Sequence, residues 1–334
     1  MTSRPHPAGR NYQVTLLALV AVYLAAVFAG FLAPYDPSAQ SRDFAFVPPT
    51  GLHWIDMSGA VHLRPFVYQE GRPYPLRFFV RGAPYRIARL FSSQRHLLGV
   101  DAPAALFLLG TDGFGRDQLS RLLYGAQISL FAGPLGAALS VVFGLVLGGL
   151  AGFFGGWVDA IIMRAGELFL AVPWYYLLFA VRMALPLRIE PQEAFAMILA
   201  IVAVVGWARP ARLIRGVVLS GRTRDYVEAA RALGASDLHV LRRHVLPQAF
   251  GVALTQAALL APQYILAEAT LSFFGLGVGE PVPSWGNMLA VLQRYDVLSS
   301  YWWMFLPGGA LLAVFLLYYL LADALHERVA ALPG

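Results

Sequence analysis

Long apolar stretches separated by shorter polar segments dominate the chain. A membrane-spanning helix needs about 20 mostly apolar residues, because the hydrocarbon core is about 30 Å thick and a helix rises about 1.5 Å per residue. Residues 14–33 and 122–158 contain no charged residue. The pattern predicts a kink at Pro173, which interrupts the third apolar stretch. We expect about six spanning helices, at approximately 14–33, 128–153, 159–183, 194–207, 248–272 and 303–323.

The first apolar stretch has two interpretations. A cleaved signal peptide usually has an apolar region of about 7–15 residues. Residues 14–33 form a longer uncharged stretch, preceded by Arg4 and Arg10 and ended by the sequence Pro-Tyr-Asp-Pro at 34–37. An uncleaved membrane anchor is therefore favoured over a signal peptide.

Arginine counts predict the orientation in the membrane. Short loops on the cytoplasmic side are enriched in basic residues. The segment 209–243 carries eight arginines and three acids, whereas the loops 184–193 and 273–302 carry one arginine each. The segment 34–127 carries ten arginines, but it is too long for this rule. Both termini and the segment 209–247 are therefore predicted to be cytoplasmic.

Composition supports a membrane protein and excludes several kinds of chemistry. Hydrophobic residues make up 58% of the 334 residues and charged residues 13%, against about 25% charged in soluble domains. The chain has no cysteine, so disulfides, thiolate metal sites and cysteine nucleophiles are excluded. All 25 basic residues are arginine, and without lysine there is neither a Walker A phosphate loop nor Schiff-base chemistry. The net charge of +6 is attributed to membrane orientation, and not to nucleic-acid binding.

The segment 36–110 differs from the rest of the chain. It is rich in Pro, Gly, His and Arg and has no spanning stretch. Residues 67–76 are typical of a turn, and 76–81 partly alternate as a half-buried strand does. We expect a small β-rich external domain here, after a cytoplasmic tail and first helix at 1–35. Its histidines, His53, His62 and His96, show no metal-ligand spacing, so we predict no metal site.

A motif of turn residues and charges follows this domain. The sequence Leu-Gly-Thr-Asp-Gly-Phe-Gly-Arg-Asp-Gln-Leu-Ser-Arg occupies residues 109–121. Thr111 or Asp112 is expected to cap a short amphipathic helix, and Asp117 is expected to pair with Arg121 four residues later. We predict an interfacial segment at 111–127, followed by the transmembrane domain at 128–325.

The loop at 209–247 is the most informative polar segment. Residues 225–233 are good helix formers, and Gly234 follows at the position where a glycine commonly ends a helix. Ser236 or Asp237 can cap a second helix that ends near Pro247. Two short helices that meet at a glycine are suited to docking in the groove of a partner, although a plain loop on the membrane surface has the same composition. These residues alone do not decide between the two interpretations.

Glycines recur every four residues in the second apolar stretch, at 144, 148, 152 and 156. This spacing places them on one helix face, and small residues allow helices to approach closely in lipid. Packing within the helix bundle is favoured over a seam that moves or that faces another subunit.

Four motifs in order resemble one family of transport proteins. Glu228-Ala229-Ala230, Gly234 and Leu246-Pro247 are similar to the EAA signature of binding-protein-dependent ABC importer permeases, in which His244 occupies a position that is usually Ile. The motif at 109–120, the sequence 155–164 and the sequence 268–289 resemble the dipeptide, oligopeptide and nickel branch. The match covers about 105–310 and is closest to the C-type permease subunit. It departs from the family in the inserted segment 36–105 and in the chain ending at 319–327.

The resemblance implies a fold and a set of partners. The fold would be the type I ABC importer transmembrane fold, all-α and polytopic, with a small β-rich external insertion. This subunit would form half of a pathway through the bacterial cytoplasmic membrane and contact membrane lipid. A homologous permease would supply the other half as a heterodimer, two ABC ATPase subunits would bind below, and an extracytoplasmic solute-binding protein would deliver the cargo. The chain would bind no cofactor, and ATP and Mg would lie in the ATPase subunits.

The resemblance also indicates three groups of site residues. The coupling group in the EAA loop comprises Asp225, Glu228, Ala229, Ala230, Gly234, His244, Leu246 and Pro247. The external motif comprises Gly110, Thr111, Asp112, Gly115, Arg116 and Asp117. The motif at the end of helix 5 comprises Glu268, Ser272, Gly275 and Gly277. None of these residues is expected to be catalytic.

Two acidic residues have competing interpretations. Glu228 is favoured as a polar contact with an ATPase, and the alternative is an ion pair with Arg224 or Arg231 in its own helix. Glu268 lies near the end of a spanning helix, where an acid is costly and often functional. Structural anchoring is favoured for Glu268 over a proton relay.

Several other functions compete with a peptide importer. Nickel chelates or oligosaccharides could be the cargo of the same kind of permease. An ion-coupled secondary transporter would show inverted repeats and ionisable residues at the midplane. No clear repeat is found in the sequence, and helices 1, 2 and 6 have uncharged interiors. A membrane enzyme would need convergent catalytic groups, and a scaffold would not explain the charged loop with its glycine.

Overall fold

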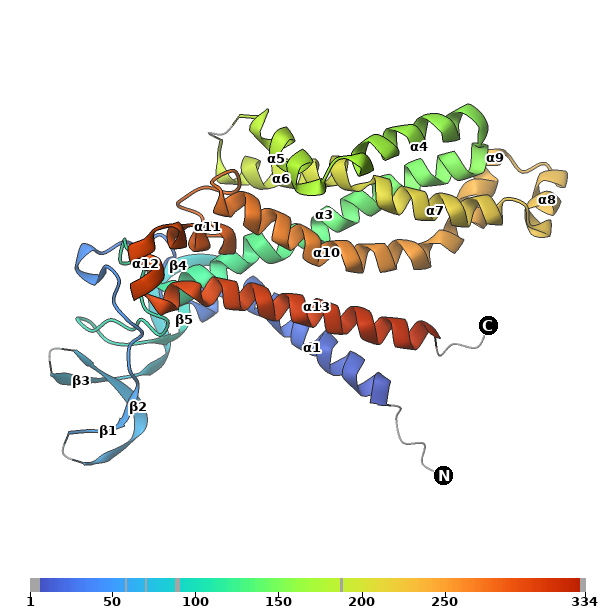
Figure 1. The fold of residues 1–334 in the computed structure, drawn as a ribbon. Coiled ribbons are helices and arrows are strands. Elements are labelled where there is room, and N and C mark those ends of the chain that lie inside the picture. Colours follow the sequence, from blue (N-terminus) through green and yellow to red (C-terminus); the bar gives the residue numbers. More distant parts are fainter. Residues whose placement is uncertain (1–6, 58, 70, 88–90, 187–188, 331–334) are drawn as a thin grey trace, which may run out of the picture. The chain divides into compact units, whose positions relative to one another are not determined.

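The computed structural model describes residues 7–330, apart from 58, 70, 88–90 and 187–188. Arg4 and Arg188, which entered the orientation argument, lie outside these residues. The chain divides into two compact units, which Figure 1 shows as one ribbon. We name residues 1–130 with 272–334 the terminal unit, and residues 131–271 the central unit.

Helices long and apolar enough to span a membrane account for part of the expected set in the described part of the chain. Three helical stretches are long and apolar enough to cross a membrane, at 118–154, 237–273 and 302–324. Two bent helix pairs raise the number to five if each pair is one span. A shorter apolar helix, Tyr12–Val27, corresponds to the first predicted span. The all-α membrane class is confirmed, and the number six depends on counting this helix and both bent pairs.

Prolines explain both bent pairs of the central unit. α4 (Gly156–Ala171) and α5 (Trp174–Met183) meet at 94° around Pro173, where the kink was predicted. α6 (Pro191–Gly206) and α7 (Ala208–Gly221) meet at 46°. In a continuous helix the ring of Pro210 would clash with the carbonyl of Gly206, four residues earlier. The helix therefore breaks at Trp207.

α7 changes the extent of the predicted cytoplasmic loop. We expected residues 209–247 to be a loop because they are rich in arginine, but residues 208–221 are helical and belong to a bent apolar pair. The connection that follows residue 221 is therefore shorter than the predicted loop. It contains α8 (Asp225–Ala232) and α9 (Asp237–Val240), followed by α10 (Phe250–Phe273).

Small residues bring the helices of the central unit close together. The glycines of α3 (Gln118–Phe154) at 144, 148 and 152 face α7, where an added Cβ would lie 2.3–2.9 Å from atoms of Pro210, Ala211 or Arg215. The expectation of close packing within the bundle is confirmed for these three positions. Gly156 is different, because it begins α4, with φ of +55° and open space beside it.

A buried hydroxyl group joins three helices of the central unit. The Ser140 hydroxyl of α3 donates to the carbonyl of Val202 on α6 (3.1 Å) and lies 2.9 Å from the Tyr264 hydroxyl of α10. Hydrogen-bonded polar groups between helices replace the water that the membrane interior lacks. This arrangement holds α3, α6 and α10 together.

The terminal unit combines two long helices with the β-rich region that was predicted to be external. α1 (Pro7–Val27), followed by the single turn α2 (Ala29–Leu32), packs along α13 (Leu306–Ala330). The hydroxyls of Tyr23 and Tyr318 meet at 2.8 Å between them. Two short helices, α11 (Trp285–Ala290) and α12 (Tyr295–Ser300), precede α13.

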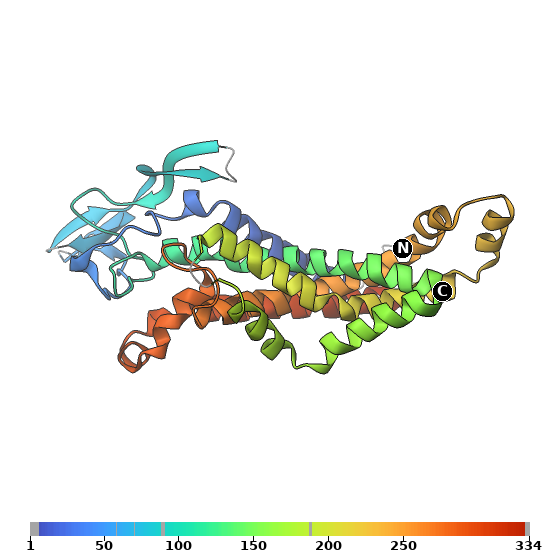
Figure 2. The same ribbon diagram turned by 90° about the horizontal axis from the view of Figure 1, so that it is seen from above.

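The predicted β-rich region forms two antiparallel sheets. β1 (His53–Ile55), β2 (Val61–Gln69) and β3 (Arg72–Pro75) pair in that order. β4 (Arg77–Ile87) pairs with β5 (Phe91–Gly99) in a second sheet, with Phe78 opposite Leu98, and Figure 2 shows these two strands side by side. The strand expected at 76–81 is confirmed inside β4. The turn expected within 67–76 lies between Gln69 and Arg72, which pair with each other, and it joins the end of β2 to β3.

Histidines in this region have protein partners. His96 is 1% exposed, and its two ring nitrogens lie 2.6 Å and 2.9 Å from the carbonyl oxygens of Ala33 and Ala83. His62 contacts Asp56 at 3.0 Å. Among the described residues, no three His, Asp or Glu side chains are grouped as metal ligands would be.

Candidate functional site

The external motif at 109–121 forms a buried network around Asp112. One carboxylate oxygen of Asp112 accepts hydrogen bonds from the backbone amides of Phe114 (2.9 Å) and Arg116 (3.0 Å). The other accepts from Nε of Arg116 at 2.7 Å, and both side chains are 6% exposed. Backbone and side chain thus converge on one buried carboxylate, which fixes the shape of the loop.

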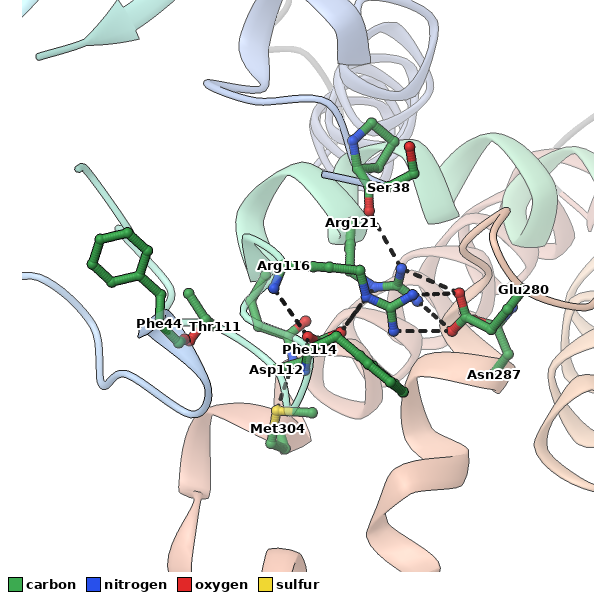
Figure 3. Close-up of polar contacts among 12 residues, drawn as sticks. Ser38, Phe44, Thr111, Asp112, Phe114, Arg116, Arg121, Glu280, Asn287 and Met304 are labelled. Carbon is green, nitrogen blue, oxygen red and sulfur yellow. Dashed lines mark hydrogen bonds and ion pairs between the residues drawn. The ribbon is translucent and has the colours of Figure 1, made fainter. Parts of the chain in front are cut away.

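Glu280 completes this network from a distant part of the sequence (Figure 3). Its carboxylate contacts Arg116 at 2.6 Å and Arg121 at 2.8 Å. The Glu280 side chain is 46% exposed, so its loss of solvation is only partial; that loss would raise its pKa, but the charges of Arg121 and Arg116 outweigh it and hold the pKa below its ordinary value. The predicted Asp117–Arg121 pair is wrong, because Arg121 pairs with Glu280 and approaches Asp112 at 3.6 Å.

Sequence reasoning missed Glu280. The local motif contains two acids and two arginines, so its charges are balanced and give no sign of a missing partner. Glu280 lies 159 residues after Arg121, in a loop rich in Gly and Pro. No pattern at helical spacing connects the two residues.

The glycines and the threonine of the motif pack against the chain segment 41–47. Gly115 has φ of +71°, and a Cβ on it would lie 1.9 Å from the carbonyl oxygen of Ser41. Gly110 has φ of +76°, and a Cβ there would lie 2.8 Å from the carbonyl oxygen of Val47. The Thr111 hydroxyl donates to the carbonyl of Phe44 at 2.5 Å and accepts from the amide of Val47 at 2.8 Å. Segment 41–47 therefore belongs to the motif's structure.

Asp117 caps α3, a role that was expected for Thr111 or Asp112. Its Oδ2 accepts hydrogen bonds from the amide (2.8 Å) and the hydroxyl (2.6 Å) of Ser120. Burial raises the pKa of Asp117 to about 6, against the lowering effect of these hydrogen bonds. The expected short interfacial helix is the beginning of α3, which continues without a break to Phe154.

The motif at the end of α10 forms a tight turn. The Ser272 hydroxyl accepts a hydrogen bond from the amide of Val278 at 3.2 Å. A Cβ on Gly277 would lie 2.0 Å from the Ser272 hydroxyl, so no side chain fits there. Gly275 turns the chain after the helix with φ of +73°. Glu268 is fully buried one turn before Ser272 in sequence.

α8 and α9 form a compact hook at the ends of α7 and α10 (Figures 1 and 2). Gly234 has φ of +87°, which favours glycine. Its amide donates to the carbonyl of Arg231 (2.9 Å), and the amide of Ala235 donates to the carbonyl of Ala230 (3.1 Å). These two bonds define a Schellman motif, which satisfies the last carbonyls of the helix. The predicted end of the helix at Gly234 is confirmed.

The outer surface of this hook is exposed and partly apolar. Leu233 is 89% exposed and Leu238 is 55% exposed. Glu228 is exposed as well, and neither of its two expected helical partners pairs with it, since Arg231 instead contacts Asp237 at 3.3 Å. Among the described residues Glu228 has no ion-pair partner. A leucine exposed to this extent beside an unpaired acid is suited to a protein partner.

The inner surface of the hook is anchored to the helices. Val227 of α8 is fully buried, and the Arg231 guanidinium lies 5.3 Å from the centre of the Phe153 ring at the end of α3. The Tyr226 hydroxyl contacts the Gln248 side chain. The chain then enters α10 through a π-helical turn, Leu241–Val245, and a 3-10 turn, Leu246–Ala249.

The coupling residues fall into an exposed and an anchored group. Asp225, Glu228, Ala229, Gly234 and Pro247 are exposed, whereas Ala230, His244 and Leu246 are half-buried. His244 and Leu246 lie in the two turns that lead into α10. The Asp225 carboxylate at the first turn of α8 is favourable to the helix dipole. The residues that were predicted to bind a partner are therefore on the surface, and those near α10 link the hook to that helix.

Comparisons with known proteins agree with the motifs. Residues 144–331 match the family described as binding-protein-dependent transport system inner membrane component. The di/tripeptide transport system permease protein DppC of Pseudomonas aeruginosa (strain UCBPP-PA14) is 34% identical over 94% of this chain and 86% of that protein. The dipeptide transport system permease protein DppC of Bacillus subtilis (strain 168) is 34% identical over 74% of each chain. A solved chain of the MetNI methionine ABC transporter aligns with 64% of this chain and 97% of its own length, at 18% identity and a TM-score of 0.48.

Proposed function

The chain belongs to the inner membrane components of binding-protein-dependent transport systems, and from this premise we propose that it forms half of the pathway of an ATP-driven peptide importer. The other half is a homologous permease subunit. Relatives that cover most of the chain are named for dipeptide or di/tripeptide transport, which supports peptides as the cargo. A solute-binding protein delivers the peptide on the external side, and both termini lie in the cytoplasm.

The hook formed by α8 and α9 is the docking site for an ATPase subunit. The observation that carries this proposal is a combination on one exposed hook: Leu233 and Leu238 lie on either side of the Schellman turn at Gly234, and Glu228 has no ion-pair partner among the described residues. Beside Leu238, the residues His239, Arg242 and Arg243 line a cavity of about 460 Å³. An ATPase groove with an apolar floor and acidic rim would complement this surface. ATP and Mg would bind in that partner, because a lysine-free chain cannot supply a Walker A loop.

The anchored side of the hook supports transmission of force to the spans. Movement of α8 would reach the end of α3 through Arg231 and Phe153, and the start of α10 through Tyr226 and Gln248. Closure of the ATPase dimer would then bias the spans between inward- and outward-facing states. The rigid turn at Gly234 keeps the two short helices in one geometry during this movement.

Co-purification from native membranes tests this proposal. Tagged wild-type protein is expected to retain an ATPase, with ATP hydrolysis in the purified sample. Gly234→Asp should lose it, because a non-glycine side chain at φ of +87° strains the turn and adds a charge to the docking surface. Gly71→Asp is the matched control, since Gly71 also has a positive φ, +74°, and open space around it, and it lies far from the hook in sequence.

Two results would contradict the proposal. Folded wild-type protein that retains no ATPase would remove the basis for ATP-driven import. Retention of the ATPase by folded Gly234→Asp protein would show that the hook is not the docking site.

A further inference from the structure

The central unit contains two adjoining cavities between α7, α10 and the loop that joins α4 to α5. Their volumes are about 420 Å³ and 590 Å³, within the range of about 300–1,000 Å³ that is typical of small-molecule sites. Both are lined by Leu170, Arg209, Leu260 and Gln263. Arg209 and Gln263 therefore stand where the two cavities meet.

The polar residues of these cavities lie deep within the helices. α7 ends and α10 begins at the hook, so depth can be measured from that end on both helices. Arg209 is 12 residues before the end of α7, or about 18 Å along its axis. Gln263 is 13 residues after the start of α10, or about 20 Å. In a hydrocarbon core about 30 Å thick, this is an interior position for a charge.

Two arginines of α7 lack anionic partners at this depth. Arg215, the next arginine toward the hook, forms a bidentate ion pair with Asp159. Arg209 lines both cavities and Arg212, nine residues before the end of α7 or about 14 Å, lines the larger one; both are exposed and make no ion pair within the part of the chain that the structure describes. No Asp or Glu occurs among the described residues that line either cavity. Because an unpaired charge inside a membrane is costly, we expect these guanidinium groups to bind an anionic group.

The remaining lining residues suit a peptide. The amide side chains of Gln256 and Gln263 offer both donors and acceptors. On the other side, Trp174 stacks on Tyr264 with ring centres 5.5 Å apart and an angle of 16° between the planes. The cavities thus combine cations, amides and an aromatic surface, which match a carboxylate, peptide groups and an apolar side chain.

We propose that Arg209 and Arg212 bind the C-terminal carboxylate of the peptide as it passes through the permease. The planar guanidinium group matches a carboxylate with two parallel hydrogen bonds. This proposal rests on the proposed function, and it adds the chemical group that the pathway recognises and the residues that recognise it. The positive charges of these two arginines offset the free-energy cost of moving the carboxylate into the membrane.

The test uses the whole transporter, with its ATPases and binding protein, in sealed vesicles. Uptake of tritium-labelled dialanine is measured at increasing concentrations of peptide-loaded binding protein. Arg209→Gln and Arg212→Gln should each lower the maximal uptake rate about tenfold or more, because each removes charge-assisted hydrogen bonds to the carboxylate. The concentration of binding protein at half-maximal uptake should not change, since docking occurs elsewhere.

Two further variants serve as controls. Arg209→Lys keeps the positive charge, so its maximal uptake rate should lie between that of Arg209→Gln and that of the wild type. Arg164→Gln removes an arginine of the same unit whose side chain is 83% exposed and paired with Glu167, and it should transport like the wild type.

The outcomes separate the inference from its premise. Normal uptake by both glutamine variants, with wild-type uptake intact, would overturn the inference and leave the peptide importer standing. An assembled wild type that transports no peptide would overturn both. Loss of the second permease from the purified variants would assign the arginines to a subunit contact. A defect that disappears in vesicles without anionic lipid would assign them to a lipid phosphate, and either result would overturn the proposal.

Discussion

The external motif around Asp112 and the hook around Gly234 both stand out in the sequence, but they differ in burial. In the external motif the charges are buried and each arginine has an acidic partner within the terminal unit. In the hook the charges are exposed, and Glu228 has no ion-pair partner among the described residues. The first arrangement fixes the fold of the chain itself, and the second leaves groups available to another protein. A sequence motif alone therefore does not show whether its residues stabilise the fold or bind a partner, and the burial of their side chains distinguishes the two roles.

The largest difference between these regions should appear in stability. Asp112→Ala removes a buried carboxylate that accepts from two amides and faces two buried arginines. Breaking a buried pair in this way costs about 3–5 kcal/mol. Asp237→Ala removes the exposed partner of Arg231 and should cost less than about 1 kcal/mol.

Thermal unfolding in detergent, followed by tryptophan fluorescence, measures both variants. Asp112→Ala should lower the midpoint by several degrees and Asp237→Ala by little. Equal midpoints for the two variants would contradict the contrast between a structural network and an interface.

A smaller effect should appear in the pH dependence of stability. Burial raises the pKa of Asp117 from 3.8 to about 6, so the folded protein binds this proton more tightly than the unfolded protein does. The contribution of Asp117 to stability is therefore greatest below pH 3.8 and is lost as the pH rises to about 6. The full difference is on the order of 3 kcal/mol.

Asp117→Asn isolates this contribution. The midpoint of the variant relative to the wild type should rise between pH 4 and pH 6 and stay constant above that. Glu280, whose pKa is lowered, changes in the opposite direction in both proteins and cancels in the comparison. A difference that does not vary with pH would show that Asp117 is ionised throughout.

Local patterns predicted those parts of the molecule that depend on neighbouring residues. The bend at Pro173 follows from one missing amide, and the end of α8 at Gly234 follows from one left-handed turn. The strand in β4 follows from alternation. Each of these features is decided within a few residues of the chain, and each was correct.

Contacts between distant residues were not predictable in this way. Helical spacing suggested Asp117 as the partner of Arg121, but the tertiary structure brings Glu280 there. The arginines of α7 made residues 209–221 resemble a cytoplasmic loop, because a charge count cannot distinguish a loop from a helix that lines a cavity.

The most direct test of the account compares two exposed leucines. Leu233 is 89% exposed on the hook, and Leu63 is 103% exposed on β2 of the external region. Neither side chain contributes to the core, so Leu233→Asp and Leu63→Asp should both fold. The measurement is the ATPase activity that co-purifies with each variant from native membranes. The account predicts loss of activity for Leu233→Asp and wild-type activity for Leu63→Asp, and full activity with Leu233→Asp would contradict it.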